Sequence, residues 1–581
     1  MYAGKVATVP VPQVEGKDAI RILTNGYVYF ATNRRWDSVQ KRTLEDRVPI
    51  GRLDEKNSKM MYPNKNFEKI FGRIDPEVDN LKKIYDRENL REAGRFDFEM
   101  SYGPYVALKE CAKKCGLLDA LQRAMPLIAQ RVLAVAIHPI VNRLSTAQNF
   151  DDWIFDNYCG FDIPLSDSDV SKLFKVIGNN ARSREIFFEL YRKNFHEIFP
   201  NTNSEERVCA FDSTNQKSTS KTIAKAQFGK SKNDKIERII NTAVYTDELT
   251  SISIWYENYD GNILDKSQTP YSIEKAKQLG YKKLFLMMDR GYFSFKNTQI
   301  FNGQNIGFGM MMPETVSAVK EMIWAYKDKI KLQEQYYIHE EDIYGIQTTI
   351  ELIGEKLQTC EFYCYVYYDN NTYYEELKSI HEKTIYYLQK AKSRKRYSKK
   401  FAEHFKKFGI IIDNTSKNDE TNQNFIITTD HEMIQEACDQ AGFFIIISNR
   451  MMSAKNMIHI ARSRDSVEKG FMFLKSHFNL ATTGVHNDVV YDGKMFVAFI
   501  SLILLQSFRW FTKDLLTSKT SETTSTLIAE LRKYKIRQTK ENDWMPVYAM
   551  NKKQKDIFKC ISLTEGKVVN DVRSLRVKNR N

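Results

Sequence analysis

Residues 206–313 carry an alternation of strand and helix patterns that restricts the possible folds more than any other feature of the chain. Val208, Ala210 and Asp212 alternate with their neighbours as in a strand, and two further β-rich runs follow, the second closing on an Asp-Gly turn. A short helix that stops at a glycine comes next, then an apolar strand, a second helix and another strand. The predicted order is three strands, helix, strand, helix, strand, which indicates an α/β domain with a mixed sheet.

Two aspartates come directly after apolar strand patterns in this order. Asp212 closes the apolar part of RVCAFDST, and Asp289 ends KLFLMMD. A carboxylate beside an apolar strand is costly unless it has a partner, so both positions are candidates for chemistry. The element order is that of the ribonuclease-H fold, in which the first and fourth strands lie side by side. We therefore expect a ribonuclease-H-like mixed sheet in which Asp212 and Asp289 reach the same edge.

A third acidic residue, Glu468, lies in the helical pattern SRDSVEKGFMFLKSHF. At 100° per residue, Arg464, Glu468 and Lys475 fall within about 40° of one another on the helix surface. Such a stripe suits a metal ligand flanked by two cations that bind phosphate. The alternative is a salt bridge between Arg464 and Glu468 within the helix, which contributes roughly 0.3–0.5 kcal/mol.

Three carboxylates from distant segments are the ligands that a phosphodiester-cleaving site requires. The reaction needs an activated nucleophile and a stabilised leaving oxygen, and two Mg²⁺ ions about 3.5–4 Å apart provide both. Asp and Glu oxygens are suitable ligands for this hard cation. The sequence therefore predicts Asp212, Asp289 and Glu468 as catalytic residues that bind two Mg²⁺ ions, with Mn²⁺ as a substitute.

Composition favours a polyanionic partner and excludes several other classes of protein. The chain has 87 basic and 73 acidic residues and a net charge of +14, which favours nucleic acid but does not separate DNA from RNA or an anionic membrane surface. The eight cysteines form no Cys-x-x-Cys pair, as expected of reduced thiols in a cytoplasmic protein without a zinc site. The most apolar run, MFVAFISLILL, is too short to span a bilayer and predicts a buried helix. No phosphate-binding Gly-x-x-x-x-Gly-Lys loop is present.

Changes of pattern along the 581 residues predict six regions. They are a β-rich or irregular N-terminal region (1–100), a mainly helical region that would bind DNA ends (101–205), the first part of the core (206–313), a β-rich insertion domain (314–441), the second part of the core with the Glu468 helix (442–515), and a helical C-terminal tail (516–581).

Two segments outside the core are candidates for DNA contact, each with a structural alternative. Within 101–205, a short helix that Ser168 would cap could dock in a DNA groove as part of a helix-turn-helix, or belong to a structural helical bundle. The run KAKSRKRYSKK could line a groove for the DNA backbone, or be a solvated charged surface. Its candidate DNA-binding residues are Lys392, Arg394, Lys395 and Arg396.

The motifs AFDST at Asp212 and MDRGYFS at Asp289 resemble those of the DDE transposases of bacterial insertion sequences, in the group with a β-rich insertion before the glutamate. The spacing of Arg464, Glu468 and Lys475 is also that group's spacing. One position departs from the pattern. The family has a tyrosine three residues before the arginine, where this chain has Ala461, and we consider Tyr292 and His459 as substitutes for it.

The resemblance implies metal-dependent cleavage at transposon ends and transfer of the exposed 3′-OH into target DNA. It further implies that Arg290, Tyr292, Arg464 and Lys475 contact DNA near the scissile phosphate. The expected partners are double-stranded DNA, namely terminal inverted repeats and target DNA, and a second copy of the chain in a homodimer, with no membrane. The expected location is the bacterial cytoplasm, at the nucleoid. Two alternatives remain: a ribonuclease-H-fold nuclease or resolvase without strand transfer, and a non-catalytic DNA-binding protein derived from a transposase.

Overall fold

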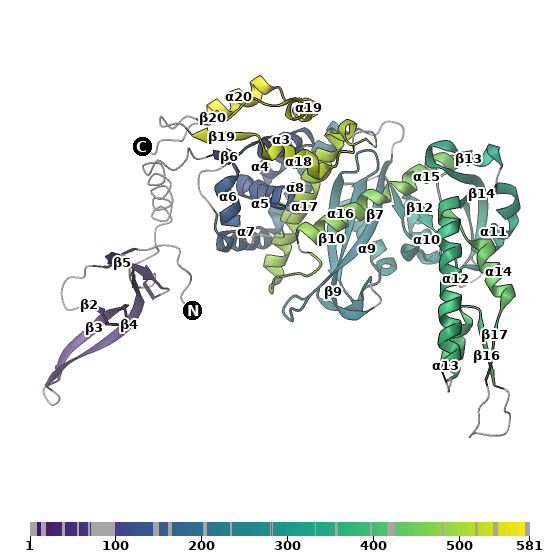
Figure 1. Cartoon of the computed structure of the whole chain (residues 1–581), viewed down its shortest axis with the longest axis horizontal. Coiled ribbons are helices and arrows are strands. Elements are labelled where there is room, and N and C mark those ends of the chain that lie inside the picture. The colour runs from purple at the N-terminus through teal and green to yellow at the C-terminus, as the bar shows by residue number, and fades with distance from the viewer. Residues whose placement is uncertain are drawn as a thin grey trace.

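The structure is a computed structural model, drawn in Figure 1. It describes residues 9–12, 19–37, 41–54, 57–64, 66–67, 70, 99–142, 150–160, 165–200, 206–232, 235–278, 280–281, 283–331, 333–354, 358–394, 398–414, 425–478, 480–517, 521–538 and 544–575.

A large mixed sheet forms the centre of the fold, and its first half has the predicted order of elements. The strand order is β10-β9-β7-β11-β12, with β11 parallel to both β7 and β12 and the other pairs antiparallel. A short additional strand, β8 (Gln227–Lys230), pairs with β9. The elements are β7 (Arg207–Lys217), β9 (Ile236–Asp247), β10 (Ser253–Asp260), α9 (Asp265–Gln278), β11 (Leu284–Met288), α10 (Phe295–Gly303) and β12 (Gly307–Met311). This arrangement confirms the ribonuclease-H-like expectation.

The same sheet continues into the insertion, which was expected to form a separate domain. Strand β18 (Phe443–Ser448) is antiparallel to β12 on one side and to β15 on the other, so that Ile447 lies between Met310 and Cys364. Because both edges of β18 are paired, β15, β14 and β13 extend the core sheet. Their bounds are β13 (Tyr337–Ile338), β14 (Ile343–Ile353) and β15 (Thr359–Tyr368).

Beyond the sheet, the insertion carries an arm built on the long helix α12 (Figure 1). A short helix and a two-stranded ribbon pack against the end of α12 around a small core of Ala391, Phe405 and Ile410. The bounds of these and the neighbouring helices are α11 (Ser317–Ile330), α12 (Asn370–Lys392), α13 (Lys399–Lys406), β16 (Ile410–Asn414), β17 (Phe425–Thr429) and α14 (His431–Gln440). The first residues of the basic run KAKSRKRYSKK, up to Lys392, therefore belong to helix α12.

The helical region before the core packs on α17 (Asp488–Phe511), which carries the most apolar run of the chain. Nearly every residue of α17 from Tyr491 to Phe508 is buried, which confirms the predicted buried helix. No described helix is long and apolar enough to cross a membrane. The helices of this region are α3 (Gly103–Lys114), α4 (Leu117–Ala124), α5 (Ala129–Asn142), α6 (Phe150–Asp156), α7 (Asp167–Asn179) and α8 (Ala181–Ile198).

Helix α7 buries Val170, Leu173, Phe174 and Ile177, and its N-cap differs from the prediction. Ser166, not Ser168, caps the helix, and the side chain of Asp169 completes a capping box with Ser166. The apolar face of α7 lies against α17, while Lys172 and Lys175 are exposed on its other side. Helix α7 therefore packs within the helical bundle. Its exposed basic side is still a candidate for DNA contact.

Helices α7 and α17 approach so closely that two glycines stand at their contact. A Cβ on Gly493 would lie 1.9 Å from the carbonyl oxygen of Phe174, and a Cβ on Gly178 would lie 1.7 Å from that of Val489.

Because backbone atoms cannot move aside as a flexible side chain does, we expect Gly493→Ala to destabilise the protein by about 1–3 kcal/mol. Thermal unfolding measures this loss. Gly566→Ala in α20 (Glu565–Ser574) is the control, because nothing lies within 4 Å of its Cβ position, and its melting temperature should not fall. An unchanged melting temperature for Gly493→Ala would contradict the described packing.

The two ends of the chain form smaller sheets. The N-terminal strands have the order β1-β5-β4-β3-β2 around a small core that includes Val28, Ile50 and Met61. Their bounds are β1 (Val9–Pro10), β2 (Ala19–Ile22), β3 (Tyr27–Asp37), β4 (Arg42–Asp54) and β5 (Asn57–Pro63). The β-rich expectation for residues 1–100 is confirmed where the structure describes them.

The C-terminal tail is helical as expected in α18, α19 and α20, but it also contains two short strands. The predicted helix ends at Arg532, and Lys535–Gln538 forms a strand, β19, between β6 and β20. Strand pairing with Glu99–Ser101 decides this, because a contact so distant in sequence cannot be read from local pattern. The bounds are β6 (Glu99–Ser101), α18 (Thr524–Arg532), β19 (Lys535–Gln538), β20 (Trp544–Pro546), α19 (Lys552–Cys560) and α20 (Glu565–Ser574).

Candidate active site

Strands β7 and β11 place the two aspartates next to each other. The parallel register pairs Phe285 with Val208 and Met287 with Ala210, and its continuation sets Asp289 opposite Asp212. Asp289 follows directly after β11, as predicted, and its Oδ1 accepts a hydrogen bond of 2.8 Å from the backbone N–H of Arg290.

Asp212 does not end its strand, contrary to expectation. Strand β7 continues to Lys217 because its other edge stays paired with β9 as far as that residue. On the β11 side, however, pairing stops at Ala210. Asp212 therefore lies just beyond the point where the pairing of β7 with β11 ends.

Glu468 arrives on the second of two consecutive helices. Strand β18 leads into α15 (Ala454–Arg462) and then α16 (Arg464–His477), and α16 coincides with the helical pattern predicted around Glu468. At the break, the Ser463 hydroxyl donates to the carbonyl oxygen of Ile460, and the Ser466 hydroxyl donates to that of Ser463, both at 2.6 Å. Serine side chains that bond to nearby carbonyls compete with the regular helix pattern, which accounts for the break.

Helix α16 packs against β7 and β9 through its apolar face, and this packing fixes the direction of its charged residues. Val467, Phe471 and Leu474 are buried, while Glu468 is exposed and Lys475 is partly buried. When the apolar side of an amphipathic helix is buried, the charged residues beside it lie at the border of the buried contact. That border faces the two aspartates.

The three carboxylates meet around the guanidinium of Arg464. Its Nη2 lies 3.7 Å from Asp212 Oδ2, 3.6 Å from Asp289 Oδ2 and 3.6 Å from Glu468 Oε1. No two of these oxygens can then be further apart than twice the longest of these distances. Residues separated by more than 250 positions in sequence thus converge on one point. The Arg464–Glu468 pair within the helix, which was the structural alternative, is also present.

Burial governs the electrostatics of this cluster. Asp212 is buried, and burial raises the pKa of its carboxyl, although Lys232 and Arg464 act in the opposite direction. Burial lowers the pKa of Lys475, and so does the charge of Lys232, while Asp212 raises it. Asp212 therefore carries a desolvation cost, and cations on two segments, Lys232 in the β8–β9 turn and Arg464 on α16, partly compensate for it.

Lys232 is a site residue that the sequence analysis missed. It lies in the turn between β8 and β9 and is exposed. Even so, among the charges that lower the pKa of Asp212, that of Lys232 has the largest effect. The signal was present in the sequence as a run of lysines, Lys230, Lys232 and Lys235, in the first hairpin after the Asp212 strand. Only the fold of that hairpin brings the run to the acidic cluster.

The three carboxylates are suitable in chemical type for a hard divalent cation, but in this structure their oxygens are too far apart to hold one. Three carboxylates from separate segments are suitable ligands for Mg²⁺ or Mn²⁺. Among the described residues, however, no group of three or more His, Cys, Asp or Glu side chains is close enough together to hold a metal ion. The oxygens of Asp212, Asp289 and Glu468 surround Arg464 Nη2 instead.

The residues expected to bind DNA near this site differ in accessibility. Arg290 is exposed and forms an ion pair of 2.8 Å with Glu314. Tyr292 is buried, with its ring centroid 5.0 Å from that of Phe211, a residue on the face of β7 opposite Asp212. The structure therefore does not offer the Tyr292 ring to DNA, because η1 (Arg290–Tyr292) turns it into the core.

The basic run of the insertion lies on the arm, away from the acidic cluster (Figure 1). Lys392 is exposed at the end of α12, and the exposed Arg394 lies over the ring of Phe401 at 4.2 Å. Lys395 and Arg396 lie outside the described residues. The structure does not bring the described residues of this run together with Asp212, Asp289 and Glu468.

Ala461, the departure from the family pattern, packs with the apolar cluster under α15, and the nearby His459 faces a separate pocket. His459 pairs with Glu341 at 3.1 Å and with Glu248 at 3.5 Å. With these carboxylates around it, His459 is poorly placed to bind a phosphate in place of the missing tyrosine.

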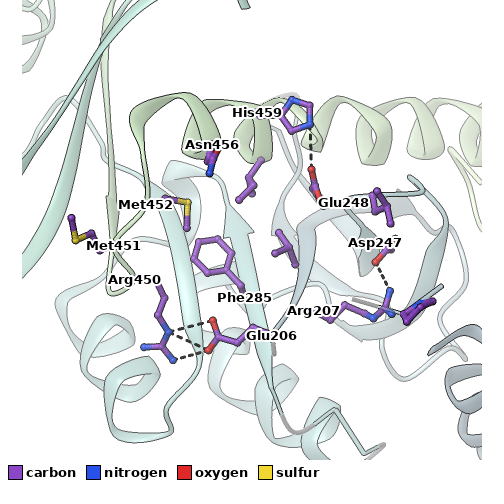
Figure 2. Close-up of a pocket in the computed structure, with 14 residues that line it drawn as sticks. Glu206, Arg207, Asp247, Glu248, Phe285, Arg450, Met451, Met452, Asn456 and His459 are labelled. Carbon is purple, nitrogen blue, oxygen red and sulfur yellow. Dashed lines mark hydrogen bonds and ion pairs between the residues drawn. The ribbon is translucent and has the colours of Figure 1, made fainter. Parts of the chain in front are cut away.

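This pocket has a volume of about 600 Å³ and lies near the starts of β7 and β11 (Figure 2). Phe285 stands between two ion pairs at its wall, the bidentate pair of Arg450 with Glu206 and the buried pair of Arg207 with Asp247. None of the three residues of the acidic cluster lines it. The pocket and the acidic cluster are therefore separate features.

A ribonuclease-H-like sheet on which three acidic residues converge defines the class of this chain. Comparison with known families matches residues 203–504 to the transposase DDE domain, a span that holds all three acidic residues. The chain belongs to this family of transposase DDE domains.

Among solved structures, the chain is similar to piggyBac transposase, determined by cryo-EM as a synaptic complex with hairpin DNA. The sequence identity is 8%, the TM-score is 0.31, and the match covers 83% of this chain and 87% of that one. A search of curated proteins finds no match.

Proposed function

We propose that this protein is a DNA transposase that cleaves transposon ends and joins the released 3′-OH to target DNA. The observation that carries the proposal is the convergence of Asp212, Asp289 and Glu468 on one point, within a chain of the transposase DDE domain family. Two of these residues come from neighbouring strands and one from a helix, so rigid elements position all three.

Asp212, Asp289 and Glu468 would hold the divalent ions, Mg²⁺ or Mn²⁺ in its place. Bound there, the ions would activate the attacking oxygen and stabilise the leaving one. In the first step, a water oxygen bonds to phosphorus and the 3′ oxygen of the strand leaves and takes up a proton, which frees a 3′-OH. In the second step, that 3′-OH oxygen attacks a target phosphodiester, its proton is released, and the target's own 3′ oxygen leaves.

Cations of the chain would position the DNA. Lys232 and Lys475 lie beside Asp212, and Arg290 is exposed next to Asp289, so all three can reach phosphates near the scissile bond. Lys392 and Arg394 on the arm would contact the backbone further away. Helices α3–α8 would bind the transposon ends.

Two transposon ends must be brought together for transposition, so the active form is proposed to be a homodimer on DNA. We further propose that the element is a bacterial insertion sequence and that the protein acts in the cytoplasm, at the nucleoid. Inverted repeats on both sides of the reading frame, with short direct duplications outside them, would support this origin.

The test is a joining reaction with pre-cut ends. Duplexes that carry the flanking inverted repeat and a free 3′-OH are incubated with the protein, supercoiled plasmid and Mg²⁺. We expect covalent joining of the duplex to the plasmid, visible as labelled plasmid on a gel. The matched control is the same duplex with a 3′-dideoxy end, which has no nucleophile and should not be joined.

The same assay separates the alternatives. Metal-dependent nicking of intact ends without joining of pre-cut ends would indicate a nuclease or resolvase. Binding of the ends without nicking in Mg²⁺ or Mn²⁺ would indicate a non-catalytic DNA-binding protein. Either outcome would overturn the proposed transposase function.

A further inference from the structure

Arg464 stands at the centre of the acidic cluster, where a cation is needed but where its own bonding is incomplete. Its side chain is only 11% exposed, and its Nη2 faces all three carboxylates. A buried Asp212 beside two more carboxylates would be strongly destabilised without a positive charge close by. Arg464 supplies that charge in the absence of metal and DNA.

The contacts that hold Arg464 are ion pairs without good hydrogen bonds. Its three carboxylate distances of 3.6–3.7 Å exceed the usual range for an N–H···O bond. Its described hydrogen bond runs from Nη1 to the sulfur of Met311, at 3.4 Å, and sulfur is a weak acceptor. Its buried Nε has no hydrogen-bond partner among the described residues. A guanidinium has five N–H donors, which normally all find acceptors when the group is buried. In this position Arg464 neutralises the charge of the carboxylates but makes few good hydrogen bonds.

From this geometry we infer that Arg464 is a displaceable internal cation, which neutralises the three carboxylates until divalent metal ions bind and then moves out of the cluster. The inference rests on the proposed metal-dependent function and adds a regulatory step to it. A metal ion and the guanidinium need the same oxygens, so they compete. Bound metal ions would take over the neutralisation of the carboxylates and so offset the loss of these long ion pairs, and the released guanidinium is then free to contact a DNA phosphate.

The competition makes an unusual prediction about Arg464→Met, a variant that removes the charge and keeps much of the side-chain bulk. Without metal, the carboxylates repel one another uncompensated, so the melting temperature in EDTA should fall below that of the wild type. With metal, nothing has to be displaced, so Mn²⁺ should bind about tenfold tighter to the variant than to the wild type. A merely structural role for Arg464 would lower the melting temperature without tightening the binding of metal.

Isothermal titration of the full chain with Mn²⁺ in the absence of DNA measures this affinity, and thermal unfolding with EDTA or Mn²⁺ measures the stability. Arg462→Met is the matched control, because Arg462 is two positions away and pairs with Glu341 outside the cluster. Its affinity for Mn²⁺ should equal that of the wild type. Should Arg464→Met fail to fold, Arg464→Lys takes its place, since the shorter side chain keeps the charge but cannot reach all three carboxylates, and Mn²⁺ should again bind more tightly than to the wild type.

Unchanged or weaker Mn²⁺ binding by the folded variant overturns the inference, and so does a lack of binding by both proteins. Neither result decides the proposed function, which depends on metal-dependent nicking and joining of DNA. Conversely, tighter binding of Mn²⁺ by Arg464→Met together with a failure of the wild-type protein to nick DNA would support the internal cation and reject the transposase.

Discussion

Asp212→Asn should abolish metal-dependent nicking of transposon ends, with a loss of at least about a thousandfold in rate. The substitution keeps the shape of the side chain but replaces one of its two oxygens with a nitrogen and removes its negative charge. Asp212 is the most buried of the three acids, so no water can readily take over the position of its carboxylate. The measurement is the rate of Mg²⁺-dependent nicking of a labelled end duplex.

Two controls separate this loss from unfolding. Burial raises the pKa of Asp212, so its ionised form is disfavoured by folding, and at neutral pH the uncharged asparagine should not lower the melting temperature. Asp465→Asn removes an acid three residues before Glu468 whose partner is the exposed Lys469, and this variant should nick normally. If Asp212→Asn still nicked at near the wild-type rate, the acidic cluster would not be the active site.

Lys475→Met should reduce the rate of nicking by about a hundredfold while leaving its dependence on metal unchanged. Lys475 is partly buried on α16 and lies close enough to Asp212 and Lys232 for their charges to affect its pKa. A cation held on a rigid helix beside the acids can stabilise the negative charge that develops on the phosphate. Because Lys475 is not a proposed ligand, the Mn²⁺ concentration that gives half-maximal nicking should not change.

Lys469→Met is the matched control, since Lys469 is on the same helix but is exposed and pairs with Asp465. It removes the same charge from the chain and should lower the rate only slightly. An equal loss in both variants would mean that overall charge, and not the position of Lys475, determines the effect. A change in the metal dependence of Lys475→Met would mean that this lysine acts on the carboxylates instead of on DNA.

Much of the core could be predicted because its pattern is local. Continuous apolar strands, glycine stops and the three-strand, helix, strand order depend on residues close together in sequence, and the structure confirms them in β7, β11 and β12. The side-by-side placement of Asp212 and Asp289 follows from that order. The amphipathic pattern of α16 likewise fixed which side of the helix would be buried.

The errors share one physical cause, which is contact between segments far apart in sequence. Asp212 was placed at a strand end, but pairing with β9 continues β7 to Lys217. The tail was expected to be helical, but pairing with Glu99–Ser101 makes Lys535–Gln538 a strand. Tyr292 was assigned to DNA, but the turn after β11 directs it into the core against Phe211.

Local pattern predicts the class of fold, the three candidate acidic residues and the helix face that carries Glu468, because strand and helix periodicity and residue chemistry are local properties. The position of Arg464 among the three carboxylates and the approach of Lys232 to Asp212 are visible only in the folded chain. Position in space depends on how the sheet, the β8–β9 hairpin and α16 pack together. That packing is a property of the whole chain, and no stretch of residues encodes it alone.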